Sequence, residues 1–116
     1  DIDVFDIEVD RFAAAKGLVE KFGGVAVLKG SGTIVQTKGE LPVVILAGNP
    51  GMASGGVGDV LAGIIGGLLA QNFGLFLSAY LGALLHATAG DLAAKKIGER
   101  PMVASDIIDQ LARPLI

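Results

Sequence analysis

The sequence has no cysteine, no tryptophan and only one histidine among its 116 residues. The lack of cysteine excludes disulfides and thiolate metal sites, and one histidine leaves little for a zinc site. Aromatic residues make up 5% of the chain, too few for a base-stacking platform, and the net charge is −3. We therefore predict no nucleic-acid partner, no transition-metal chemistry and no metal-binding residue. The absence of cysteine also fits a reducing, cytoplasmic compartment, and the acidic segment DIDVFDIEVDRF lacks the features of a secretory signal.

Charge is also missing from one long apolar run, since no Asp, Glu, Lys or Arg occurs from Val60 to Gly90. Such a run is long enough to cross a bilayer, and Gly63 and Gly67 form a GxxxG pair of the kind that membrane helices use for close packing. Gln71 and Asn72 interrupt the run, however, and no Lys or Arg flank orients a span. We expect two buried helices joined by a polar turn and no membrane partner; a glycine-rich membrane or assembly module is the non-enzymatic alternative.

Apolar periodicity predicts an α/β order of elements. The predicted helices cover residues 9–22, 59–70, 75–97 and 106–111. The first is amphipathic, with Phe12, Val19 and Phe22 among its apolar positions, and the last is capped by Ser105. The predicted strands are VAVLK (25–29), TIVQT (33–37) and LPVVIL (41–46). The first strand is of the kind buried on both faces, and the other two form a hairpin or adjacent strands. Three strands make a thin sheet, so we expect a longer domain or a partner that covers the sheet edge.

What the sequence has in abundance is glycine. The stretch AGNPGMASGGVG, residues 47–58 and here called the glycine loop, joins a predicted strand to a predicted helix. Glycines let backbone N–H groups converge on a ligand, and the positive end of the helix favours an anion. Neither GxxxxGK[ST] nor GxGxxG is present. We predict a phosphate site in which Asp59 accepts the proton of an attacking hydroxyl during phosphoryl transfer. The alternative role for Asp59 is a first-turn acid that complements the helix dipole.

A second candidate loop is LKGSGT, residues 28–33, at the end of a predicted strand. Its small residues allow close backbone approach, Lys29 can neutralise a phosphate, and Thr33 offers a hydroxyl. The alternative is an ordinary turn between strands. Among the other polar residues, His86 fits a core or edge histidine. Asp91 fits a solvated or helix-pairing acid, with a position facing the site as its alternative.

Three segments together carry a resemblance: LKGSGT, GNPGMASGGVGDVLAGIIGGLLAQ and HATAGDLAAKKIGERPMVASDII. They resemble the C-terminal half of the ADP/ATP-dependent NAD(P)H-hydrate dehydratases, a family of the ribokinase-like superfamily. The resemblance implies an α/β fold in which residues 1–116 form the C-terminal portion of a single three-layer α/β/α domain whose N-terminal half is absent. Sugar kinases of the same superfamily typically show an Asp-Thr pair before GxGD, whereas the leader GNPGMAS favours the dehydratase branch.

The resemblance also implies a function. The family repairs nicotinamide cofactors hydrated at C6: ADP or ATP, with Mg²⁺, phosphorylates the C6 hydroxyl, and loss of phosphate restores NADH or NADPH, which makes the enzyme a lyase. By this resemblance the nucleotide-binding residues are Lys29, Gly30, Ser31, Gly32, Thr33 and Gly58. The anion hole comprises the backbone N–H groups of Gly55, Gly56, Val57 and Gly58, and Asp59 contacts the hydrate and acts as the base.

The sequence leaves several alternatives open. A ribokinase-like kinase for a sugar or vitamin alcohol is the competing enzymatic interpretation. ADP and ATP, and the hydrates of NADH and NADPH, are not distinguished. The resemblance places much of the hydrate pocket in the other half of the domain, so we do not expect the 116 residues to be active alone. The uncovered sheet edge predicts a homo-oligomer.

Overall fold

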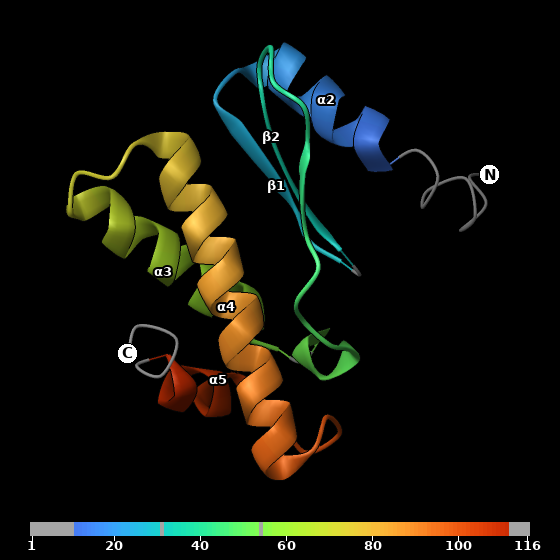
Figure 1. Cartoon of the computed structure of the whole chain (residues 1–116), viewed down its shortest axis with the longest axis vertical. Coiled ribbons are helices and arrows are strands. Elements are labelled where there is room, and N and C mark those ends of the chain that lie inside the picture. Colours follow the sequence, from blue (N-terminus) through green and yellow to red (C-terminus); the bar gives the residue numbers. More distant parts are fainter. Residues whose placement is uncertain (1–10, 31, 54, 112–116) are drawn as a thin grey trace.

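The structure is a computed structural model that describes residues 11–30, 32–53 and 55–111. Its elements follow the predicted order, with a short 3-10 helix added inside the glycine loop (Figure 1). In chain order they are α2 (Arg11–Phe22), β1 (Val25–Leu28), β2 (Thr33–Thr37), β3 (Val43–Ile45), the 3-10 helix η1 (Pro50–Ala53), α3 (Val57–Ala70), α4 (Leu75–Ile97) and α5 (Ala104–Gln110).

The three strands form one antiparallel sheet in the order β1-β2-β3, so the predicted hairpin of the second and third strands is confirmed. Val35 in the central strand pairs with Val27 on one side and with Val43 on the other. Helix α2 packs on β1 and β2, and α4 packs on all three strands from the opposite face (Figure 1). Helices α3 and α5 pack against α4. The sheet therefore lies between two helical layers, as the α/β/α prediction requires.

The main core lies between the sheet and α4. Val35 and Ile45 from the sheet pack there with Leu61 of α3 and with a row of alanines of α4, all of them buried. Because side chains alternate along a strand, Ile34 and Gln36 point to the other face, where α2 covers them. A second buried cluster joins the start of α3 to α4 and α5, and comprises Val57, Ala89, Ala93, Met102 and Ile107.

Small residues let α3 and α4 approach closely. A Cβ built at Gly82 of α4 would lie 2.6 Å from Cγ1 of Ile65 of α3, so a larger residue there would force Ile65 or the helices to shift. Helix α4 is long and apolar enough to cross a membrane by length and composition, but the core helix of a globular domain passes the same test. Apart from His86, its buried residues are small, and it occupies the centre of the fold, as the prediction of a buried helix requires.

Several local predictions were wrong. β1 is not buried on both faces: its four side chains are half-buried because it is an edge strand, and the central strand β2 carries the fully buried residues. Phe12 and Phe22 do not lie on the buried side of α2, where the narrow sheet covers only Ala15 and Val19.

Two helix starts also differ from the prediction. Ser105 does not cap α5, because the helix begins at Ala104 and the N–H of Val103 donates to Asp106 Oδ2 at 2.8 Å. Helix α3 begins at Val57, two residues before the predicted start, so Asp59 lies inside its first turn. The glycine loop is therefore shorter than predicted, and its last two residues are helical.

Candidate functional site

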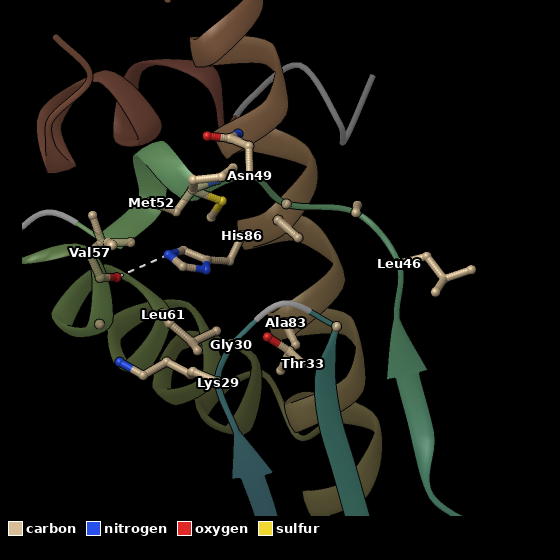
Figure 2. Close-up of a pocket in the computed structure, with 17 residues that line it drawn as sticks. Lys29, Gly30, Thr33, Leu46, Asn49, Met52, Val57, Leu61, Ala83 and His86 are labelled. Atoms are coloured by element: carbon tan, nitrogen blue, oxygen red, sulfur yellow. Dashed lines mark hydrogen bonds between the residues drawn. The ribbon is translucent and has the colours of Figure 1, made fainter. Parts of the chain in front are cut away.

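The two predicted loops meet at one pocket of about 540 Å³ at an end of the sheet (Figure 2). The β1–β2 loop, the segment after β3, the start of α3 and the middle of α4 form its walls. The lining residues are Lys29, Gly30, Gly32, Thr33, Leu46, Ala47, Gly48, Asn49, Pro50, Met52, Ala53, Val57, Gly58, Leu61, Ala83, His86 and Ala87. Segments that are distant in the sequence thus converge at one cavity.

The start of α3 supplies to this pocket backbone N–H groups that bond no other described residue. Gly56, the N-cap, has φ of 85°, in the left-handed region that favours glycine, and no side chain described here caps the helix. The first N–H groups of an α-helix have no partner within the helix, and the helix dipole makes this end positive. Val57 and Gly58, the first two helical residues, line the pocket. The arrangement suits an anion such as a phosphate.

Lys29 brings a cation to the same place. Its side chain extends from the end of β1 toward α3 (Figure 2), and a Cβ at Gly58 would collide with Lys29 Nζ. The absence of a side chain at Gly58 therefore lets the ammonium group lie against the helix start. Thr33, the first residue of β2, adds a half-buried hydroxyl-bearing side chain to the wall.

The β1–β2 loop has a backbone that suits its glycines. Gly32 has φ of 73° and Gly30 has φ of 153°, conformations that side chains disfavour. Arg11 of α2 braces this loop, because its Nη2 donates to the carbonyls of Leu28 at 3.2 Å and Gly32 at 3.0 Å. The loop is a turn between two antiparallel strands, and it also lines the pocket.

The first part of the glycine loop is held by α4. Asp91 Oδ2 accepts a hydrogen bond of 2.9 Å from the N–H of Gly48, and Asp91 Oδ1 accepts one of 2.9 Å from Asn49 Nδ2. The Asn49 amide also donates to the carbonyl of Gly90, and its Oδ1 accepts from the N–H of Gly51. Asp91 is therefore a partner of the loop and not a solvated acid.

His86 is buried in the pocket wall, and its Nε2 lies 3.0 Å from the carbonyl oxygen of Val57 (Figure 2). A carbonyl can only accept, so Nε2 must carry the proton. Burial is the main cause that lowers the pKa of His86 below 6.5, and the charge of Lys29 also lowers that pKa, while the bond to Val57 raises it. The ring is therefore neutral at pH 7, as a core histidine should be, but it also lines the site.

The predicted site residues divide into two groups. The structure brings Lys29, Gly30, Gly32, Thr33, Val57 and Gly58 together on the pocket wall. Gly55 and Gly56 are exposed in the turn before α3 and do not line the pocket, and Ser31 lies outside the described residues. Asp59 is exposed in the first turn of α3, and it makes no hydrogen bond or ion pair to a described residue.

Sequence reasoning missed Asn49 and understated the connection of His86 and Asp91 to the site. The dipeptide Asn49-Pro50 after a strand was a usable turn signal. Nothing in the sequence pairs position 49 with position 91, because that bond depends on how α4 crosses the loop. Among the residues that the structure describes, no cluster of three or more His, Asp or Glu side chains could hold a metal ion.

The chain is similar to known proteins along almost its whole length. Residues 2–113 match the family model described as NAD(P)H-hydrate dehydratase. The chain is 52% identical over 109 residues to the bifunctional NAD(P)H-hydrate repair enzyme Nnr of Vibrio cholerae, which is 94% of this chain and 22% of that enzyme. It is 49% identical over 110 residues to the Escherichia coli enzyme of the same name, which is 95% of this chain and 21% of that enzyme. The chain thus spans about a fifth of the length of these relatives.

A solved structure extends the comparison to the fold. The ADP/ATP-dependent NAD(P)H-hydrate dehydratase from Bacillus subtilis, co-crystallised with ATP and Mg²⁺, superposes with a TM-score of 0.87 at 26% sequence identity. The match covers 97% of this chain and 40% of that one. It confirms the predicted three-layer, ribokinase-like architecture.

Proposed function

Because the chain belongs to the NAD(P)H-hydrate dehydratase family, as its sequence predicted, we propose that it carries the nucleotide site and the catalytic base of a cofactor-repair enzyme. The reaction is the dehydration of C6-hydrated NADH or NADPH, driven by ADP or ATP. The observation that carries this proposal is the convergence of Lys29, Thr33 and the uncapped start of α3 on one pocket. Residues 1–116 are then the C-terminal portion of a single ribokinase-like domain.

The wall of the pocket has the chemistry that phosphoryl transfer needs. Backbone N–H groups and an ammonium group stabilise the charge that builds on the transferred phosphoryl, and the protein supplies little else except position. In our proposal the β1–β2 loop holds the nucleotide phosphates through Lys29, the backbone of residues 30–32 and Thr33. We propose that the N–H groups of residues 55–58 form the anion hole and that Gly58 contacts the nucleotide. Val57 and Gly58 line the pocket, whereas Gly55 and Gly56 lie in the exposed turn just before them.

The chemistry proceeds in two steps. The C6 hydroxyl oxygen attacks the terminal phosphorus, its proton passes to the carboxylate of Asp59, and the bond from phosphorus to the leaving nucleotide oxygen breaks. The C6–O bond then breaks with its electron pair on the departing phosphate, and the neighbouring ring carbon gives its proton to solvent, which restores the double bond. The freedom of Asp59 from any described partner supports this role, because the carboxylate is available to a substrate.

Mg²⁺ fits this site as a companion of the nucleotide. The described residues offer no cage of three or more acidic or imidazole ligands, and Mg²⁺ in nucleotide sites is usually held by phosphates with one or two carboxylates. The ion would supply charge neutralisation on the phosphates.

The test uses the full protein that contains this chain. Hydrated NADH or NADPH is mixed with MgADP or MgATP, and the return of reduced nicotinamide absorbance is followed together with free phosphate. The proposal predicts recovery with one of the nucleotides and equal release of phosphate. No recovery with either nucleotide would refute it, and a stable phosphorylated product without phosphate release would indicate a small-molecule kinase.

Asp59→Asn tests the base. The amide keeps the size of the side chain but cannot take the proton, so we expect turnover to fall by about 10²- to 10⁴-fold. MgADP binding should stay within about threefold of the wild type, because the carboxylate faces the hydroxyl and not the nucleotide. Asp109→Asn on α5, which removes an exposed carboxylate elsewhere, is the control. Near-normal turnover in Asp59→Asn would leave Asp59 as a dipole-complementing acid.

The uncovered edge of the sheet suggests how the chain is completed. β3 has no neighbour on its outer side in the described sheet, and Leu41, Val44 and Leu46 beside or within it are exposed. We propose that the rest of the domain covers this edge, and that the protein forms a homo-oligomer. We also propose a cytoplasmic location.

A further inference from the structure

The glycine loop has few side chains with which to fix its own shape. Glycine backbones lose much conformational freedom on ordering, so a loop of this composition needs outside support if its N–H groups are to stay aimed at a phosphoryl group. The structure shows such support at both ends of the loop, and in both cases it comes from α4. This inference rests on the function proposed above.

Asp91 supports the start of the loop. Its two carboxylate oxygens accept from the backbone of Gly48 and from the Asn49 amide, both at 2.9 Å. The side-chain oxygen Oδ1 of Asn49 in turn accepts a hydrogen bond of 3.0 Å from the N–H of Gly51. Charged acceptors make stronger hydrogen bonds than neutral ones, so this carboxylate fixes the position at which the loop leaves β3.

His86 supports the end of the loop. Its Nε2–H donates to the carbonyl of Val57, the first residue of α3, at 3.0 Å. Gly90 lies one turn further along α4, on the same face, and a Cβ there would collide with Met52 Sδ of η1. The middle of the loop is therefore packed directly on α4 between the two hydrogen-bonded ends.

We infer that His86 and Asp91 are positioning residues: α4 uses them to clamp the two ends of the glycine loop so that the N–H groups at the start of α3 are aimed at the transferred phosphoryl group. Neither side chain needs to touch the substrate. Lys29 and His86 are the two titratable residues in the described pocket wall, and Lys29 is the one assigned to phosphate contact. The clamp acts on the rate of phosphoryl transfer, because a small misplacement of catalytic groups lowers that rate by about a hundredfold.

The experiment compares four variants of the full protein. His86→Leu removes the donor, while His86→Gln keeps an N–H that can reach the Val57 carbonyl. Asp91→Ala removes both acceptors. Thr88→Val is the control. Thr88 lies on the same helix, and its hydroxyl donates to the carbonyl oxygen of Leu84 in that helix at 2.8 Å and not to the glycine loop. The measurements are kcat, MgADP affinity, melting temperature and amide hydrogen exchange over residues 47–61.

We expect His86→Leu and Asp91→Ala to lower kcat by about 10- to 100-fold while MgADP affinity changes much less. Exchange should quicken at residues 57–61 in His86→Leu and at residues 48–51 in Asp91→Ala. His86→Gln should restore most of kcat, and Thr88→Val should match the wild type. Wild-type kcat in both clamp variants, or a loss in His86→Leu that follows melting temperature and is not rescued by His86→Gln, would overturn the inference.

The two proposals can fail separately. If the wild type turns over no hydrated cofactor, the proposed function fails, and local hydrogen exchange still decides whether α4 clamps the loop. Unchanged exchange over residues 47–61 in both variants then refutes the clamp. If His86→Leu does not fold, Asp91→Ala decides the outcome, since Asp91 is only half-buried and its removal leaves no cavity in the core.

Discussion

Replacement of Gly58 by alanine should separate stability from function. Gly58 is the second residue of α3, and its φ is not in the left-handed region, so alanine fits the backbone there. Alanine is a better helix former than glycine by up to about 1 kcal/mol. The variant should therefore unfold at the same or a slightly higher denaturant concentration than the wild type.

The same methyl group should weaken nucleotide binding. A Cβ at position 58 would collide with Nζ of Lys29 and would lie 3.7 Å from Cε, so only the tip of the lysine has to move. That movement takes the ammonium group away from the start of α3. A hydrogen bond to a charged group contributes about 1.5–3 kcal/mol, so we expect the Kd for MgADP to rise by about 10- to 150-fold.

Gly63→Ala is the matched control for Gly58→Ala. Gly63 lies in the same helix, and a Cβ there would meet nothing within 4 Å. This variant should gain similar stability and bind MgADP as the wild type does. Calorimetric titration of the full protein measures both affinities, and urea unfolding measures both stabilities. If Gly58→Ala binds MgADP within twofold of Gly63→Ala, the juxtaposition of Lys29 with the helix start has no part in nucleotide binding.

Two further predictions concern stability. Gly82→Ala should lower the free energy of unfolding by about 1–3 kcal/mol, because its Cβ would lie 2.6 Å from Ile65 Cγ1 in the α3–α4 contact; stability equal to that of the wild type in urea would contradict this. The buried His86 should make stability depend on pH. In the unfolded chain His86 binds a proton near pH 6.5, whereas in the folded protein it binds one only at lower pH. The free energy of unfolding should therefore fall as the pH drops from 6.5 toward the lower pKa of the folded state. The difference in stability between wild type and His86→Gln, measured from pH 7.5 to 5, isolates this effect, and a difference that does not change with pH would contradict it.

Much of the fold follows from local patterns. Turn glycines at 23 and 24 were enough to predict the end of α2, and the turn signal Lys38-Gly39 between the runs TIVQT and LPVVIL was enough to predict a hairpin or adjacent strands there. The apolar run with a polar interruption was enough to predict α3 and α4. The burial of β1 was predicted wrongly, because its edge position depends on strand order and not on the strand's own residues. The cap of α5 was wrong for a local reason: the N–H of Val103 donates to Asp106 Oδ2, so the helix begins at Ala104 and Ser105 lies inside it.

The sequence by itself determined the two loops, the lysine, the carboxylate and the family, because these features occupy short continuous segments whose residue types limit their chemistry. Only the tertiary structure decided that the loops share one pocket, that Lys29 lies against Gly58, and that α4 holds the glycine loop through His86 and Asp91. The contacts of Lys29, His86 and Asp91 each join residues at least 29 positions apart. Their geometry is set by how α3 and α4 cross and by how the sheet lies on α4, and no local pattern in the chain encodes those packing angles.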